Sequence, residues 1–154
     1  MSMLSELLPP ANVLINVEVG SVKKLFELMG IFFENRFGVP KDVVYPALFE
    51  RERLGSTLIA DGCEWAIPHA VIASISEILC GLVRLKDPVI FDRRGRYASF
   101  FLFVLTPPTC SDKTSSIYKE WSMLSNRKDV IKTAQIIDDP SALYQYLFHF
   151  CCYD

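Results

Sequence analysis

The sequence predicts a single α/β domain in which a β-sheet is sandwiched between helices. The chain has 154 residues, a length that fits one domain. Hydrophobic residues make up 51% of it, enough for one core that needs neither a metal nor a disulfide. Segments with helical spacing alternate with short apolar runs, and this alternation is typical of layered α/β proteins.

The first third of the chain predicts one extended segment and two helices. Residues 13–19 alternate loosely in polarity, as a short strand or an extended arm does. Ser21 is a typical N-cap for the first helix, which ends before Pro40. A second helix is expected over residues 41–54. Pro46 predicts a kink or a late start there, because an interior proline costs about 3 kcal/mol.

Two strands are expected in the middle of the chain, after a loop over residues 56–67. Residues 77–85 predict a strand that Asp87 and Pro88 break. Residues 99–105 form a nearly continuous apolar run, which predicts a strand buried on both faces.

Helices are expected to complete the fold. Residues 113–124 and 128–136 each have helical spacing. A last helix follows Pro140, with Ser141 as its expected N-cap.

Charge and hydropathy exclude several classes of protein. The net charge is -2, which argues against a nucleic-acid binder. The mean hydropathy is +0.25, yet the longest purely apolar run spans only residues 100–105. A membrane-spanning helix needs roughly 20 such residues, so no membrane insertion is expected. No secretory signal is expected at the N-terminus, because residues 1–10 have no basic start.

The cysteines predict reduced thiols rather than disulfides or a zinc site. Their number, five, is odd, and no C-x-x-C pair occurs. Cys80 lies in an apolar run and is expected in the core.

Two histidines carry most of the chemical interest. His149 lies near the end of the last predicted helix, where a packing role is expected. His69 follows a short apolar piece and Pro68, so it is expected at the end of a strand, where α/β proteins build their sites.

A dense polar cluster precedes this histidine. Residues 51–57 read RERLGST, which fits either a solvated helix end or an anion site, since arginine offers a planar fork of donors to phosphate. Neither a Walker loop nor a G-x-S-x-G elbow occurs in the sequence.

Residues 51–57 together with residues 66–69, AIPH, resemble the signature of type 2 enzyme IIA domains of the bacterial phosphotransferase system. Within this family, the chain resembles the nitrogen-regulatory IIA proteins and the mannitol/fructose IIA domains. Their pattern runs R-E-x-x-G-S-T and then A-I-P-H. The resemblance implies a single-domain IIA type 2 fold with a mixed β-sheet. We expect the domain over residues 4–148 and a short C-terminal tail over residues 149–154.

The resemblance also implies residue roles. His69 falls on the histidine that accepts a phosphoryl group from an HPr-like phosphocarrier protein, and Arg51 falls on the arginine beside that group. Gly55, Ser56 and Thr57 would support the phosphate loop. A neutral imidazole is a competent nucleophile, and phosphoryl transfer depends on positioning and charge stabilisation, so no cofactor and no metal are expected.

The chain departs from the family pattern near this site. Cys63 and Glu64 look like an insertion, and Ala70 stands where a glycine usually follows the histidine. Many members have a second histidine, whereas this chain has none between residues 70 and 148. Its place falls among four residues that are candidates for replacing it: Lys113, Thr114, Ser115 and Ser116.

The sequence thus predicts a cytoplasmic IIA component of the nitrogen-regulatory type, a regulatory phosphoprotein labelled at His69. Its expected partners are an HPr-like phosphocarrier and a regulated target protein or a IIB acceptor. One alternative is a degenerate IIA fold that regulates partners by binding without being phosphorylated. Another is a stand-alone IIA for fructose/mannitol-type sugar uptake. A metal site on His69 and Cys63 would leave a tetrahedral set incomplete.

Overall fold

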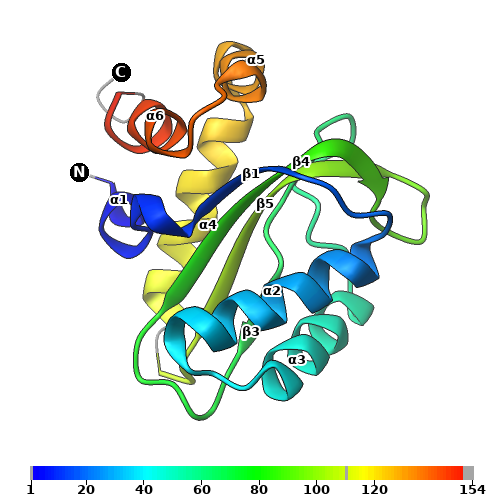
Figure 1. Ribbon diagram of the computed structural model, residues 1–154, viewed down its shortest axis with the longest axis vertical. Helices are drawn as coiled ribbons and strands as arrows, with labels where there is room; N and C mark the ends of the chain where they lie inside the picture. Colours follow the sequence, from blue (N-terminus) through cyan, green and yellow to red (C-terminus); the bar gives the residue numbers. More distant parts are fainter. Residues whose placement is uncertain (1, 110, 151–154) are drawn as a thin grey trace.

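One mixed β-sheet with helices on both faces forms the protein (Figure 1). The structure, a computed structural model, describes residues 2–109 and 111–150. The predicted fold class is confirmed. The strands are β1 (Val13–Val17), β2 (Trp65–Ala66), β3 (His69–Val71), β4 (Leu79–Ile90) and β5 (Tyr97–Thr106).

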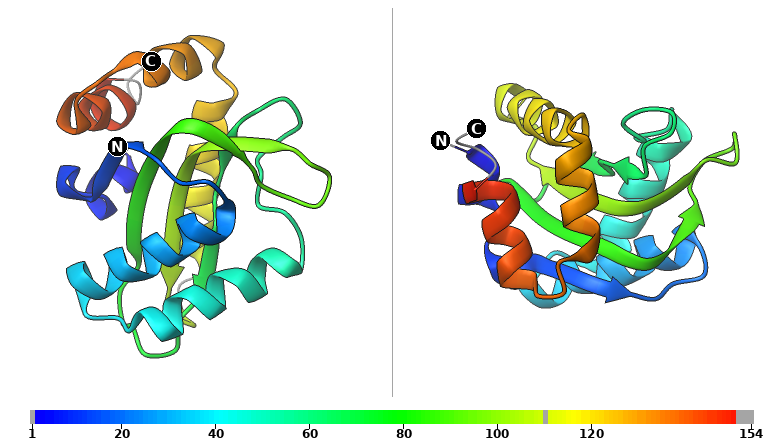
Figure 2. Two further views of the ribbon diagram at one scale, coloured as in Figure 1. Left: turned by 45° about the vertical axis from the view of Figure 1, so that its right-hand side comes forward. Right: turned by 90° about the horizontal axis from the view of Figure 1, so that it is seen from above.

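The helices divide between the two faces of the sheet. α2 and α3 cover one face, while α1, α4, α5 and α6 gather on the other (Figures 1 and 2). Their bounds are α1 (Met3–Leu7), η1 (Pro10–Asn12), α2 (Val22–Phe37), α3 (Lys41–Arg53), α4 (Ser111–Ser125), α5 (Lys128–Ile136), α6 (Pro140–Gln145) and η2 (Tyr146–Phe150).

The sheet is mixed because its pairings differ in direction. β1 runs parallel to β4, and β4 runs antiparallel to β5. β2 and β3 both pair with the outer edge of β5 in parallel, with Trp65 opposite Phe100 and His69 opposite Val104. The chain therefore touches this edge twice, on either side of Pro68, which has no N–H to donate.

β5 contributes to both cores, as its apolar run predicts. Phe100, Leu102 and Val104 belong to the core beneath α4, α5 and α6. The residues between them, such as Phe101 and Phe103, belong to the core beneath α2 and α3. Successive side chains of a strand point to opposite faces, so a strand covered on both faces is apolar at every position.

The prediction that β4 breaks at Asp87 and Pro88 is wrong. β4 continues to Ile90, and its register with β5 shifts between Arg84 and Val89. A proline is tolerated in a strand at such an irregularity, because its missing N–H interrupts a ladder that is already interrupted. Asp87 and Pro88 are exposed there.

The predicted helix ends are confirmed in part. Ser21 caps α2, with its side chain accepting a hydrogen bond from the Lys24 N–H. α3 begins at Lys41 and continues past Pro46, so a late start is wrong. The N-cap of α6 is Asp139 rather than Ser141, because the Asp139 carboxylate accepts from the Ala142 N–H and a proline fits the first helical position.

The core contains both tryptophans and also Cys80, the cysteine expected there. Trp65 and Trp121 are 1% and 0% exposed. Cys80 is fully buried, and burial raises the pKa of its thiol to about 12. Cys110, Cys151 and Cys152 lie outside the described residues. Within the described ranges, no helix is both long and apolar enough to cross a bilayer.

Candidate functional site

His69 lies where β3 begins, next to the edge of β5. Pro68 precedes it, and the Pro68 carbonyl accepts a hydrogen bond from the Val104 N–H at 3.0 Å. The β-pairing of His69 with Val104 continues this contact into β3. The imidazole is half-buried, so its backbone is held by the sheet while its ring reaches a cavity at the surface.

Both ring nitrogens of His69 have a partner, and the partners differ in kind. Nδ1 lies 2.8 Å from the carbonyl oxygen of Ile67, which accepts but cannot donate. Nδ1 therefore carries the proton. Nε2 lies 3.2 Å from Nε of Arg51, which only donates, so the Nε2 lone pair faces the guanidinium. This arrangement makes Nε2 the nucleophilic atom of the ring.

Arg51 reaches the imidazole from the last turn of α3. Its Nη1 donates to the carbonyl oxygen of Gly55 at 2.9 Å, while its Nε donates to His69. Two bonds from one planar group fix its orientation better than one bond does. Arg51 is thus an oriented positive charge beside Nε2.

The surroundings keep the imidazole neutral. Burial lowers the pKa of His69 below its usual value of 6.5, the Nδ1 bond to the Ile67 carbonyl opposes this shift, and the Arg51 guanidinium lowers the pKa further. As the pH falls, the His69 imidazole is therefore protonated at a higher pH in the unfolded chain than in the folded one. The contribution of His69 to stability is present above pH 6.5 and is lost as the pH falls below it.

We predict a protonation midpoint for His69 below 6.5 in an NMR titration of the imidazole nitrogens. Arg51→Ala should move this midpoint upward, because it removes one of the causes that lower the pKa. Arg53→Ala serves as the control, since Arg53 pairs with Glu50 at the surface. A midpoint at or above 6.5 in the unmodified protein contradicts the prediction.

Glu52 and Thr57 close the loop that follows α3. The Glu52 carboxylate accepts from the Thr57 N–H and from its hydroxyl, each at 2.7 Å. Burial raises the pKa of Glu52 above its usual 4.5, and the two bonds from Thr57 partly offset this effect. No role is predicted for Glu52 from the sequence, although its spacing from Thr57 in the motif is a signal for this pair of hydrogen bonds.

The structure places the predicted loop residues in different surroundings. The Gly55 carbonyl orients Arg51 directly. Ser56 accepts from the Leu58 N–H, and Thr57 is buried against Glu52, so neither lines the cavity at His69. A role for Ser56 and Thr57 in supporting bound phosphate stays a prediction.

The cavity at His69 has a volume of about 450 Å³ and lies between α3 and α4. Arg51 and His69 line one side, while Thr114, Ser115 and Tyr118 line the side formed by α4. Tyr118 was not singled out from the sequence. Its position four residues after Thr114, on the same helix face, is the signal that could have found it.

Comparison with known proteins assigns the chain to a family. The pattern of the family described as "Phosphoenolpyruvate-dependent sugar phosphotransferase system, EIIA 2" matches residues 6–149. The chain belongs to this EIIA 2 family. The predicted resemblance is therefore confirmed.

Individual relatives support the assignment to the EIIA 2 family. The chain is 27% identical over 144 residues to a nitrogen regulatory protein of Pseudomonas aeruginosa, with 92% of each chain covered. It is similar to the crystal structure of the nitrogen regulatory protein IIA-Ntr from Neisseria meningitidis, at 26% identity and a TM-score of 0.86, covering 95% and 99%. IIA mannitol from Escherichia coli shares the fold at 12% identity and a TM-score of 0.74, covering 91% and 98%.

Glu64, one of the two residues expected as an insertion in the EIIA 2 pattern, points away from the imidazole. The Glu64 carboxylate accepts a hydrogen bond from the Ser99 hydroxyl at 2.7 Å. Ser99 is five residues before Val104 on β5, which corresponds to roughly 16 Å along a strand. The extra carboxylate therefore does not face His69.

The candidates for the missing second histidine separate into two pairs. Thr114 and Ser115 line the cavity at His69, whereas Lys113 and Ser116 do not. Lys113 is exposed, and the Ser116 hydroxyl donates to the Asp112 carbonyl. The side of the cavity opposite Arg51 thus presents neutral hydroxyl groups rather than a second charge.

The described part of the chain offers no candidate metal centre. It contains no group of three or more histidine, cysteine, aspartate or glutamate side chains that could hold an ion. The predicted absence of a metal at His69 is not tested by this observation and stays a prediction.

Proposed function

We propose that this EIIA 2 protein accepts a phosphoryl group on His69 Nε2 from an HPr-like phosphocarrier and acts in the cytoplasm as a regulatory phosphoprotein. The observation that carries the proposal is the two-sided hold on the imidazole. The Ile67 carbonyl fixes the proton on Nδ1, and Arg51 holds a positive charge at Nε2. Nucleophile and anion-binding group are therefore next to each other before any donor arrives.

The transfer proceeds as an in-line displacement at phosphorus. The lone pair of His69 Nε2 forms a bond to phosphorus while the bond to the ring nitrogen of the donor phosphohistidine breaks. The electron pair of that bond stays on the donor imidazole. Phosphorylation at Nε2 leaves a positive charge on the His69 ring, which the Ile67 carbonyl stabilises through the Nδ1 proton.

Arg51 changes partner during this step. Its Nε–H points at the Nε2 lone pair, which the attack requires, so Arg51 turns toward a phosphoryl oxygen as the donor docks. The guanidinium then stabilises the charge spread over the phosphoryl oxygens. Because Nη1 stays on the Gly55 carbonyl, this movement is a small rotation of an anchored group.

A regulatory role is favoured over sugar uptake by the relatives. The chain covers 92% of a nitrogen regulatory protein at 27% identity, and its likeness to IIA mannitol is limited to the fold at 12% identity. The acceptor or target of the phosphorylated form is a regulated protein in this proposal. A IIB protein as acceptor would instead indicate sugar uptake.

The test is incubation with enzyme I, an HPr-like phosphocarrier and phosphoenolpyruvate, followed by intact-mass analysis at neutral pH. We expect one phosphoryl adduct on the unmodified chain and none on His69→Ala. His149→Ala is the matched control, because His149 is exposed on η2 and should leave labelling unchanged. An unlabelled chain under conditions that label a standard IIA protein would instead support a partner-binding role without phosphorylation.

A further inference from the structure

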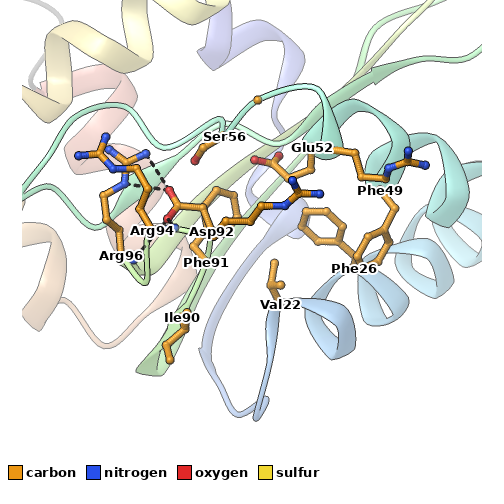
Figure 3. Close-up of a pocket in the computed structure, with 13 residues that line it drawn as sticks. Val22, Phe26, Phe49, Glu52, Ser56, Ile90, Phe91, Asp92, Arg94 and Arg96 are labelled. Carbon is orange, nitrogen blue, oxygen red and sulfur yellow. Dashed lines mark hydrogen bonds and ion pairs between the residues drawn. The ribbon is translucent and has the colours of Figure 1, made fainter.

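A second cavity, larger than the one at His69, lies beside the end of α3 and the turn between β4 and β5 (Figure 3). Its volume is about 620 Å³, and it shares none of its lining residues with the cavity at His69. Small-molecule sites usually have volumes of roughly 300–1,000 Å³. Of its lining residues, the proposed phosphoryl transfer uses only Gly55, whose carbonyl anchors Arg51 from outside the cavity at His69.

One part of this cavity is apolar. Figure 3 shows Phe26 and Phe49 next to each other on the helix side, with Val22 below Phe26 and Ile90 across the cavity at the end of β4. The rings of Phe26 and Phe49 lie 5.0 Å apart in an edge-to-face arrangement. Phe26 is fully buried, so Val22, Phe49 and Ile90 provide the apolar surface that a ligand can reach. Such a surface suits a flat apolar or aromatic body.

The rim of the cavity carries excess positive charge. Four arginines line it against two carboxylates, Glu52 and Asp92, which leaves two positive charges in a chain whose net charge is -2. Both carboxylates are already engaged, Glu52 by Thr57 and Asp92 by Arg96 at 2.7 Å. The arginines are Arg53, Arg93, Arg94 and Arg96.

Two of these arginines have donors to spare. Arg93 makes no hydrogen bond or ion pair with any residue that the structure describes. The side chain of Arg94 has only a long contact with Asp61, at 3.9 Å, and it is 69% exposed. Arg53 and Arg96, in contrast, are each paired with a carboxylate at 2.7 Å.

We propose that this cavity is a binding site for a small amphipathic anion. Its apolar body packs against Val22, Phe49 and Ile90, and its carboxylate, sulfonate or phosphate group pairs with Arg93 and Arg94. The guanidinium fork matches the oxygens of such groups. The apolar lining excludes a simple inorganic anion as the preferred ligand, because it would leave that surface uncovered.

The probe for this site is 8-anilinonaphthalene-1-sulfonate, whose fluorescence rises in an apolar site. Its neutral parent, N-phenyl-1-naphthylamine, lacks only the sulfonate group. We expect the parent to bind about tenfold more weakly, which corresponds to about 1.4 kcal/mol. Added salt should weaken binding of the sulfonate and leave binding of the neutral parent unchanged, because salt screens the attraction between the sulfonate and the arginines.

Charge reversal tests the arginines. Arg93→Glu/Arg94→Glu should weaken sulfonate binding at least about tenfold, and Arg93→Gln/Arg94→Gln, which adds no repulsion to the turn, should weaken it about threefold. Lys128→Glu/Lys132→Glu is the matched control. It changes the net charge equally on exposed positions of α5 and should leave binding within about twofold.

Amide chemical shifts locate the probe. Changes should centre on residues 52–56 and 90–96, and circular dichroism checks that each variant folds. The proposal is overturned if the shifts centre on residues 114–118, if the neutral parent binds as tightly, or if the lysine control loses as much affinity. This test reads binding alone, so its result does not depend on whether His69 is phosphorylated.

Discussion

Replacing Arg51 with alanine is expected to slow phosphorylation of His69 about 100- to 1,000-fold, the usual effect of losing one oriented donor at a developing negative charge. The reason is geometric. The Gly55 carbonyl anchors Arg51, and Nε of Arg51 lies 3.2 Å from His69 Nε2, the atom proposed to attack phosphorus. The measurement is the rate of phosphoryl transfer from the phosphorylated carrier, followed by intact mass under single-turnover conditions.

Two further variants separate charge from orientation. Arg51→Lys keeps the charge but loses the second donor that holds the side chain on Gly55, so we expect an intermediate rate. Arg53→Ala, two residues away in an exposed pair with Glu50, should transfer at the normal rate. Normal kinetics for Arg51→Ala would refute the assigned role, provided that its circular dichroism is unchanged.

The second large effect is on stability. Trp121→Ala is expected to lower the free energy of unfolding by about 3–5 kcal/mol, as a fully buried aromatic residue is lost. Trp121 is 0% exposed, and its ring centroid lies 4.5 Å from that of Trp65. Its Nε1 also donates to the Ala66 carbonyl at 3.1 Å. Urea denaturation followed by circular dichroism measures the change.

Trp121→Phe keeps most of the buried ring and removes the hydrogen bond. We expect it to cost about 1–3 kcal/mol, since the Ala66 carbonyl is left buried without this donor. The free energy of unfolding of a protein domain is only about 5–15 kcal/mol, so Trp121→Ala can prevent folding. In that case Trp121→Phe provides the measurement. Equal stability of both variants and the unmodified protein would show that the α4 contact does not hold β2.

The link between this packing and the site is short along the chain. Ala66 lies in β2, and Ile67, whose carbonyl holds His69 Nδ1, follows it directly. Trp121 lies on α4, on the face of the sheet opposite α3, and it holds β2, the strand that leads into the site. A loosened Trp121 variant should also transfer the phosphoryl group more slowly, as the imidazole loses its fixed orientation.

Much of the fold was predictable because its signals are local. The Ser21 cap and the apolar run of β5 each depend on a few neighbouring residues, and both predictions are confirmed. The break expected at Asp87 and Pro88 was wrong for a complementary reason. A turn signal was overridden by pairing with β5, a contact that the local sequence does not contain.

The site shows the same division. The roles proposed for His69 and Arg51 come from their residue types and from the motif that contains them. The hydrogen bond between Arg51 and His69 could not be predicted from the sequence, because it joins the end of α3 to the start of β3. The hydrogen bonds between Glu52 and Thr57 were not predicted, because the motif drew attention to its arginines. Tyr118 was not predicted either, because its place in the cavity depends on how α4 is rotated.

By itself, the sequence determined the family and the α/β class, and it predicted His69 and Arg51 as the pair on which phosphoryl chemistry would depend. Only the tertiary structure decided which nitrogen of His69 carries the proton, which of the residues 113–116 reach its cavity, and that Glu64 points elsewhere. The physical reason is that residue type sets what a group can do. Its partners, which lie far away along the chain, set its tautomer, its charge and the direction in which it faces.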